Sequence, residues 1–455
     1  MIRHLRRRPI ILILIAYIIL LKIVQVSGLF NSDKDGLPYN AGETFELRAV
    51  VTGAPEPRLE KDDSYTNLAI PIKTDEGDKA VILWRAKHWH KPPDYGERWL
   101  FFGSLNSEAT YGKQWIRADS RKSEQLPGSY GNRFISTCYA ARREAASILR
   151  IGIDEHGDAV TIIHAVLLGY RSSFSSSLRE VFRRTGTLHI FAISGLHVGI
   201  IAMLLTFLLK WAGVSRPSWI WYMAPLLIAY TIATGGRASA VRACVMMILL
   251  YLAPVLSRKA DTLSAIAAAA VLILMAAPGQ INDIGFIYSF TVVTGIVLIC
   301  PIIERPLLKS IERDPLAIIP ESFPVRSLRF AAKSAISILS VSVAAWLASA
   351  PLTLYFFQRF APIAPLSNLI VVPAAVLIVC TGCLSLIFGA CAAVFAFALN
   401  NINLLFVTFL KSVMELIALI PYGSFRTGHI TVWIIPAWYT ILLLVIVTIN
   451  KRRNR

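Results

Sequence analysis

The segment from residue 189 to residue 200, HIFAISGLHVGI, decides how the whole chain is interpreted. It is apolar enough to enter a membrane, yet it contains His189, Ser194 and His197. It opens a predicted membrane span at 187–209, which places His197 roughly 15 Å deep, near the bilayer midplane. At about 100° per residue, the serine and the two histidines share one side of that helix.

Two glycines, Gly195 and Gly199, fall roughly opposite this polar side. Small residues in that position predict that another helix approaches closely there. An ionisable side chain inside a membrane is costly unless protein or water solvates it. His197 is therefore either a buried histidine satisfied by a neighbouring helix or part of a water-filled cavity.

The rest of the chain has the composition of a polytopic α-helical membrane protein. It is 55% hydrophobic and 16% charged, with a mean hydropathy of +0.57, and its apolar residues are grouped in long runs. Each predicted span approaches the roughly 20 residues that cross a bilayer. After a retained N-terminal anchor at 1–30, the spans are 187–209, 217–235, 239–257, 261–277, 284–303, 334–357, 365–387, 388–410 and 431–450.

Basic residues predict the orientation of these spans. Four arginines precede the first apolar run, and the tail at 451–455 is basic, which places both termini in the cytoplasm. The loop with Lys210 and Arg216, the loop at 258–259 and the segment 304–333 then also lie inside. Because the loop between 277 and 284 has no basic residue and falls outside, the pattern is self-consistent.

Residues 31–130 differ from the rest of the chain. Short strand-like runs alternate with turns rich in Pro, Gly and Asp, which predicts a small extracytoplasmic β-barrel of OB-like type. The region has 14 Lys and Arg against 16 Asp and Glu, a net charge of 14 − 16 = −2. Its aromatic residues either stack nucleic-acid bases or fill the barrel core. They are Trp84, Trp89, Trp99, Phe101, Phe102, Tyr111 and Trp115.

The segment 131–186 connects this domain to the spans. Arginines and apolar residues recur there at helical intervals, which predicts amphipathic helices at the membrane interface.

Four further polar residues belong to the outer half of the predicted spans. Arg237 and Arg242 begin one span, Asp283 precedes another, and Asn368 lies near the start of a third. Arg242 has no neighbour in the sequence that would neutralise it. These residues predict a vestibule that is open to the outside and lined by positive charge, suited to a polar and anionic cargo.

The segments that contain these residues resemble those of the ComEC competence proteins. AVLLGYRSSFSSSLREVFRRTGTLHIFAISGLHVGII is similar to the family signature, and GGRASAVRACVM, the segment around QINDIGF and the segment ending PLSNLIVVP follow in order. The resemblance covers about 160 to 380, and weaker similarity extends over 30–130. The matching positions are His189, Ser194, Gly195, His197, Gly199, Arg242, Asp261, Gly285, Phe286, Ser289, Pro351 and Asn368.

The resemblance implies an inner-membrane channel that carries single-stranded DNA inward during natural transformation. It also implies a cytosolic helicase-like ATPase and an extracytoplasmic DNA receptor as partners, besides the membrane lipid. The channel role belongs to the matching helices together, and no catalytic role is carried over to any residue.

Two departures from the family pattern stand out. Ile287 and Tyr288 lie where the family has a segment with a glutamine that could contact substrate. Many relatives also end in a metallo-β-lactamase-like hydrolase domain, whereas this chain stops five residues after its last span and lacks the HxHxDH ligand set. We therefore expect a form without that domain, with no metal or cofactor and with a separate hydrolase protein as a possible partner.

Two other functions stay open. One is a transporter for another anionic solute, which would need a partner or a gradient for energy because no GxxxxGK[ST] loop is present. The other is an intramembrane serine hydrolase, since Ser194 and His197 are three residues apart. Ala192 replaces the glycine expected two residues before such a serine, so the sequence favours a channel that is not an enzyme.

Overall fold

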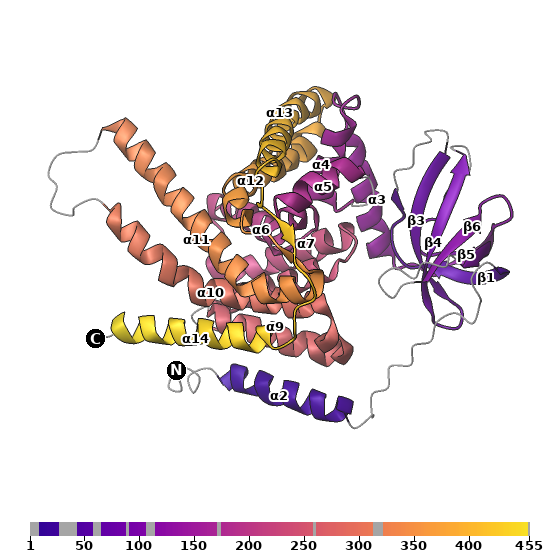
Figure 1. Ribbon diagram of the computed structural model, residues 1–455. Helices are drawn as coiled ribbons and strands as arrows, with labels where there is room; N and C mark the ends of the chain where they lie inside the picture. The colour runs from indigo at the N-terminus through magenta and orange to yellow at the C-terminus, as the bar shows by residue number, and fades with distance from the viewer. Residues whose placement is uncertain are drawn as a thin grey trace.

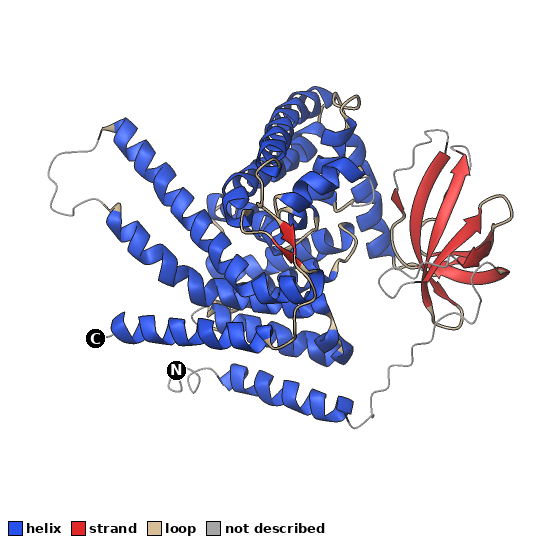
Figure 2. Cartoon of the chain, viewed as in Figure 1, coloured by secondary structure: helices blue, strands red, loops and turns tan. Residues whose placement is uncertain are grey.

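A computed structural model describes residues 9–26, 43–57, 65–87, 91–105, 114–170, 174–257, 261–312 and 322–453. The arginines that precede the first apolar run, the loop residues 258 and 259, and the aromatic residues Trp89 and Tyr111 lie outside these ranges. The chain forms a helical bundle with a separate β-barrel beside it (Figure 1). Figure 2 shows that the strands gather in the barrel, apart from one very short strand pair against the helical bundle.

The barrel is built from seven strands near the N-terminus. They are β1 (Thr44–Val51), β2 (Glu56–Pro57), β3 (Tyr65–Thr74), β4 (Lys79–Lys87), β5 (Glu97–Leu105), β6 (Gln114–Asp119) and β7 (Glu124–Ser129). The strand order β1-β3-β4-β6-β5 closes on itself because β5 also pairs with β1. A closed five-stranded ring with one parallel pair, β4 with β6, confirms the predicted small OB-like barrel.

The aromatic residues of the barrel are divided between core and surface. Trp84, Trp99 and Phe101 are buried, and their rings contact one another in edge-on and stacked arrangements. Of the two roles open from the sequence, these three therefore fill the core. Phe102 and Trp115 are only partly buried.

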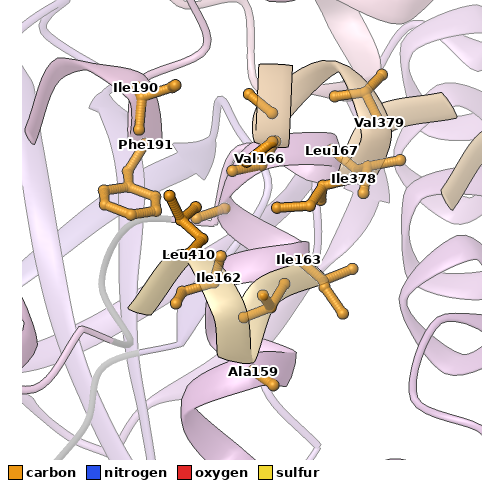
Figure 3. Packing of buried hydrophobic residues seen from close by; sticks show 14 of the residues in the cluster. Ala159, Ile162, Ile163, Val166, Leu167, Ile190, Phe191, Ile378, Val379 and Leu410 are labelled. Atoms are coloured by element: carbon orange, nitrogen blue, oxygen red, sulfur yellow. The ribbon is translucent and has the colours of Figure 1, made fainter. Parts of the chain in front are cut away.

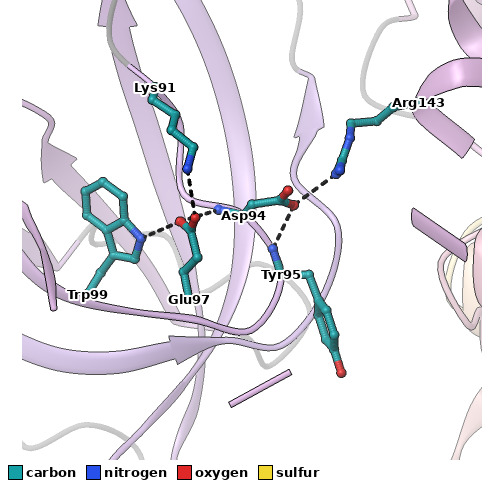
Figure 4. Close-up of polar contacts among 6 residues, drawn as sticks. All are labelled: Lys91, Asp94, Tyr95, Glu97, Trp99 and Arg143. Atoms are coloured by element: carbon teal, nitrogen blue, oxygen red, sulfur yellow. Dashed lines mark hydrogen bonds and ion pairs between the residues drawn. The ribbon is translucent and has the colours of Figure 1, made fainter. Parts of the chain in front are cut away.

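Polar contacts tie the barrel to the first helix that follows it (Figure 4). The Glu97 carboxylate accepts hydrogen bonds from Lys91, from the Trp99 indole and from the Asp94 backbone N–H at 2.9 to 3.1 Å. Burial raises the pKa of Glu97, but these three hydrogen bonds outweigh it and lower that pKa below its usual value. Arg143 donates to the Asp94 carboxylate at 3.0 Å, which joins the barrel to the helix α3 (Arg133–Ile148).

The predicted amphipathic region contains three helices, α3, α4 (Gly157–Leu168) and α5 (Ser176–Arg184), and a short 3-10 helix, η2 (Leu188–Phe191), follows it. The helix α4 corrects the expectation for this region, because most of its side chains are buried. It lies at the centre of the largest hydrophobic cluster, where Ile162 and Val166 pack near Ile378 and Leu410 (Figure 3). A helix in such a position stabilises the bundle from within and does not rest on its surface.

A helix occupies every predicted span. They are α2 (Pro9–Val26), α6 (Gly195–Trp211), α7 (Trp219–Ala233), α8 (Ala238–Leu252), α9 (Thr262–Ala276), α10 (Ile284–Ser310), α11 (Phe323–Phe357), α12 (Ala364–Gly389), α13 (Ala393–Ala418) and α14 (Ile434–Arg453). Among the described residues, α10, α11, α12 and α13 are long and apolar enough to cross a membrane. The chain is therefore a polytopic helical membrane protein with a small β-barrel.

Several helices are shorter than their predicted spans. The helices α7, α8 and α9 have 15 residues each, about 22 Å at 1.5 Å per residue, whereas the hydrocarbon core is roughly 30 Å thick. The apolar runs that suggested longer spans include the turns at the helix ends.

Close helix packing also differs from the expectation. A Cβ added to Gly199 would meet no atom within 4 Å, and one added to Gly195 would make only ordinary contact, at 3.7 Å from Ala243. The predicted glycine face of α6 is therefore not a close-packing face. A tight approach lies instead between α10 and α11, where a Cβ on Gly295 would be 2.3 Å from the Cβ of Ala348.

Candidate functional site at the helix amino termini

The segment HIFAISGLHVGI is not one continuous helix. Residues 188–191 form the 3-10 helix η2, Ser194 is extended, and α6 starts only at Gly195. His197 is therefore the third residue of α6 and does not lie about 10 residues inside a span. His189 belongs to η2, so the single polar face predicted for these residues is wrong.

Ser194 and His197 instead form a capping box. The Ser194 hydroxyl accepts a hydrogen bond from the Leu196 N–H at 3.3 Å, and His197 Nδ1 accepts one from the Ser194 N–H at 3.3 Å. Capping residues satisfy the backbone N–H groups that the first turn of a helix leaves without partners. The requirement to cap the start of α6 thus explains Ser194 and His197, whereas His189 takes no part in the cap.

The capping box bears on the hydrolase alternative. Ser194 Oγ lies 3.3 Å from His197 Nδ1, so the two side chains do meet. However, the same nitrogen accepts from the backbone N–H of Ser194, and His197 is fully buried. The pair therefore has a structural explanation that needs no nucleophile.

We expect Ser194→Ala to lower the stability of the protein by about 0.5–2 kcal/mol through loss of the cap, with membrane transport largely retained. A fluorophosphonate probe should label neither the wild type nor the variant. Labelling of the wild type that disappears in Ser194→Ala would instead establish a nucleophilic serine.

Arg242 and Asp283 come together from α8 and the start of α10. Arg242 is 4% exposed, and its Nη1 lies 3.8 Å from Oδ1 of Asp283. The Asp283 carboxylate also caps α10 by accepting from the Phe286 N–H at 2.7 Å. A Cβ on Gly285 would be 3.3 Å from Arg242 Nη2, so the glycine leaves room for the guanidinium group. The sequence identified both charged residues but not their pairing.

The Arg242 charge is incompletely compensated. Its Nε and Nη1 are buried and have no hydrogen-bond partner among the residues that the structure describes. The Asp283 side chain is 53% exposed and remains largely hydrated. A buried cation beside a water-exposed carboxylate leaves positive potential toward the interior of the bundle.

Arg237 does not join this pair. It precedes α8 and forms an ion pair with Glu56 on strand β2 of the barrel. Arg142, which sequence analysis did not single out, lies close by in α3, with its guanidinium 3.8 Å from the centre of the Tyr170 ring. Burial lowers the pKa of Arg142. These groups attach the barrel to the bundle and are not a continuous lining with Arg242.

Asn368 occupies the second turn of α12. Its side-chain oxygen is buried without a hydrogen-bond partner among the described residues. None of the hydrogen bonds found in the described ranges links it to another candidate residue. It remains a polar group inside the bundle, separate from the Arg242–Asp283 pair.

The amino termini of three helices converge around Arg242. The Ser239 hydroxyl of α8 donates to the Ile193 carbonyl just ahead of α6 at 2.6 Å, and Gly195 faces Ala243. The Arg242–Asp283 pair joins α8 to the start of α10. Because each helix amino terminus carries a partial positive charge, the arrangement favours an anion on this side of the bundle.

The fold and this cluster define a class of membrane-embedded helical bundle with a positively charged helix-terminus site and an attached barrel. The family model described as "Competence protein" matches residues 166–452, more than half of the chain. The chain belongs to this competence protein family, which confirms the resemblance recognised in the sequence.

A curated relative supports the same assignment. ComE operon protein 3 of Bacillus subtilis (strain 168) is 25% identical over 217 residues, which are 48% of this chain and 25% of that protein. The chain thus covers about a quarter of the relative's length. No solved structure matches the chain.

Proposed function

We propose that the protein is a channel of the bacterial inner membrane that carries single-stranded DNA into the cell during natural transformation. The observation that carries the proposal is the buried, partly compensated Arg242 at the converging amino termini of α6, α8 and α10. Membership of the competence protein family supports DNA as the cargo.

A phosphate backbone must bring successive negative charges into a region of low dielectric constant. A single unit charge in such surroundings is strongly disfavoured unless a positive charge or oriented dipoles compensate it. Arg242 supplies the positive charge, and the amino termini of α6, α8 and α10 supply the oriented dipoles. In this proposal His197 holds the start of α6 and acts on transport through shape.

The chain divides, in this proposal, into the anchor 1–30, the extracytoplasmic β-domain 31–130, the linking helices 131–186, the channel 187–450 and the cytoplasmic tail 451–455. A cytosolic helicase-like ATPase would pull the strand inward, and an extracytoplasmic receptor would deliver it. A separate hydrolase protein could degrade the opposite strand. These partners rest on the family resemblance.

The orientation gives a direct prediction. Reporter fusions near residue 100 and at Arg455 should report opposite sides of the membrane, with the barrel outside and the C-terminus inside. We expect this orientation because the segments assigned to the cytoplasmic side carry the excess of basic residues. The same side for both fusions would contradict the arrangement in which DNA meets Arg242 from outside.

Uptake of labelled DNA tests the function itself. Cells that contain the protein should accumulate one strand of a labelled duplex in the cytosol, and cells without it should not. A small anionic solute is the second candidate cargo, because positive charge alone does not distinguish the two. Import of labelled phosphate or sulfate that depends on the protein, without import of DNA, would favour that alternative.

A further inference from the structure

A basic cleft lies apart from the Arg242 site. It has a volume of about 440 Å³ and is formed by the end of α5, the two-stranded pair β8 (Arg359–Phe360) and β9 (Phe425–Arg426), and the turn after α13. Four arginines and one glutamate give it a positive charge. The side chains used below are Glu180, Arg183, Arg184, Arg359, Tyr422 and Arg426.

The carboxylate in the cleft is already shared by two arginines. Glu180 pairs with Arg183 at 2.7 Å and with Arg184 at 3.3 Å. Among the residues that the structure describes, no carboxylate forms an ion pair with Arg359 or Arg426. One negative charge therefore faces four positive charges, and the cleft has a net charge of about +3.

Two of these arginines are held against each other. Arg359 and Arg426 are directly opposite in the antiparallel pair β8–β9. Like charges at directly opposed positions destabilise a strand pair. Burial, followed by repulsion from Arg183 and Arg426, lowers the pKa of Arg359.

The strand pair that carries this repulsion is firmly anchored. The Phe360 ring packs against Phe425 and against Trp346 of α11. The Trp346 indole donates to the Ala361 carbonyl at 3.0 Å. The two arginines are thus held in place by the surrounding packing, as in a site prepared for a ligand that carries negative charge.

The cleft adjoins the start of the helical bundle. At Gly186, between α5 and η2, φ is +73°, and a Cβ would lie 2.7 Å from that of Ala364 at the start of α12. This close contact joins α5 to the amino terminus of α12, a few residues ahead of Asn368. A ligand in the cleft would therefore lie near the amino terminus of α12.

We propose that this arginine cleft binds the phosphodiester backbone of a single-stranded nucleic acid before it reaches the Arg242 site, an inference that rests on the proposed function. Arginine matches phosphate oxygens with paired N–H donors, and two opposed guanidinium groups can accept one phosphate between them. Tyr422 is 84% exposed at the rim, where it offers a ring for a base to stack on.

Binding of a fluorescent single-stranded oligonucleotide to the full-length protein, in nanodiscs of phosphatidylcholine alone, tests the inference. Arg359→Gln/Arg426→Gln should weaken binding by about tenfold or more. It should also reduce the slope of log affinity against log salt by about 0.7, because the two arginines share one phosphate and each phosphate contacted on a single strand contributes about 0.7. Arg359→Lys/Arg426→Lys should retain part of the affinity, because lysine keeps the positive charge but not the paired N–H donors.

Arg121→Gln is the matched control, since it removes an exposed arginine from a turn of the barrel and should leave binding unchanged. Relief of the cross-strand repulsion should leave the double glutamine variant with a melting temperature equal to or above that of the wild type. A lower affinity in a protein of undiminished stability would therefore identify lost contacts to the nucleic acid.

Other outcomes would overturn the inference. Equal affinity and equal salt slope in wild type and the double variant would exclude the cleft as a nucleic-acid site. An effect confined to nanodiscs that contain phosphatidylglycerol would assign the cleft to anionic lipid headgroups. If the double variant binds and imports DNA normally while Arg242→Glu blocks import, the inference fails and the proposed channel stands. If the wild type neither binds nor imports DNA, both fail.

Discussion

Cells that carry a well-inserted Arg242→Glu variant are expected to import no measurable labelled DNA. The substitution places a carboxylate beside Asp283 and reverses the only charge that faces the converging helix termini from α8 within the described residues. A phosphate backbone would then meet like charge in a poorly hydrated path, where each repulsive contact costs several kcal/mol at short range. Arg242→Lys should retain part of the uptake, because it keeps the charge but not the planar donor group.

The pairing with Asp283 requires a control for folding. Asp283→Asn removes the negative charge but keeps a side-chain oxygen that can still cap α10. We expect this variant to import DNA at least as well as the wild type, because the neighbouring carboxylate no longer offsets the positive charge of Arg242. Each variant must also accumulate in the membrane as the wild type does.

Two results would contradict the role given to Arg242. Normal uptake by Arg242→Glu would show that the charge is not on the path. Loss of uptake in a stable Asp283→Asn variant would show that the ion pair matters only as a structural link between α8 and α10.

A second large effect is expected at Gly295. Gly295→Ala should destabilise the protein by about 1–3 kcal/mol, because its new Cβ would lie 2.3 Å from the Cβ of Ala348 and force α10 and α11 apart. Gly295→Leu should largely prevent accumulation of folded protein. Thermal unfolding in detergent, followed by size-exclusion chromatography, measures both.

Gly199→Ala is the matched control, because it makes the same change in α6 with no atom within 4 Å. Alanine favours a helix over glycine by roughly 0.5–1 kcal/mol, so this variant should be as stable as the wild type or more stable. Equal losses at positions 295 and 199 would contradict the packing described for α10 and α11.

The existence and order of the helices could be predicted from sequence because the hydrocarbon core of a membrane offers no water to bond the backbone. Every backbone polar group in a span must be satisfied within the span, so long apolar runs become helices. The alternation of short apolar runs with turn residues likewise predicted the barrel. Its aromatic residues were ambiguous, since a tryptophan in a strand can face either the core or the solvent.

Helix ends were harder to predict. The polar residues of HIFAISGLHVGI were assigned to one face of a deep span, whereas Ser194 and His197 cap α6 at its first turn. A serine followed three residues later by a histidine lacks the Glu or Gln of the usual capping signature, so the local signal was weak. The segments on both sides of the cap are apolar. A hydropathy average therefore does not show where the helix begins.

By itself, the sequence determined that this is a polytopic membrane protein of the competence family with a small barrel, because composition, periodicity and motifs are local properties of the chain. Only the tertiary structure decided which charges meet: Arg242 with Asp283, Arg237 with Glu56, and Arg359 with Arg426. These pairs join residues that are 41, 181 and 67 positions apart, from 283 − 242, 237 − 56 and 426 − 359. Electrostatic energy depends on distance in space and on local burial, and folding sets both only when the helices have packed.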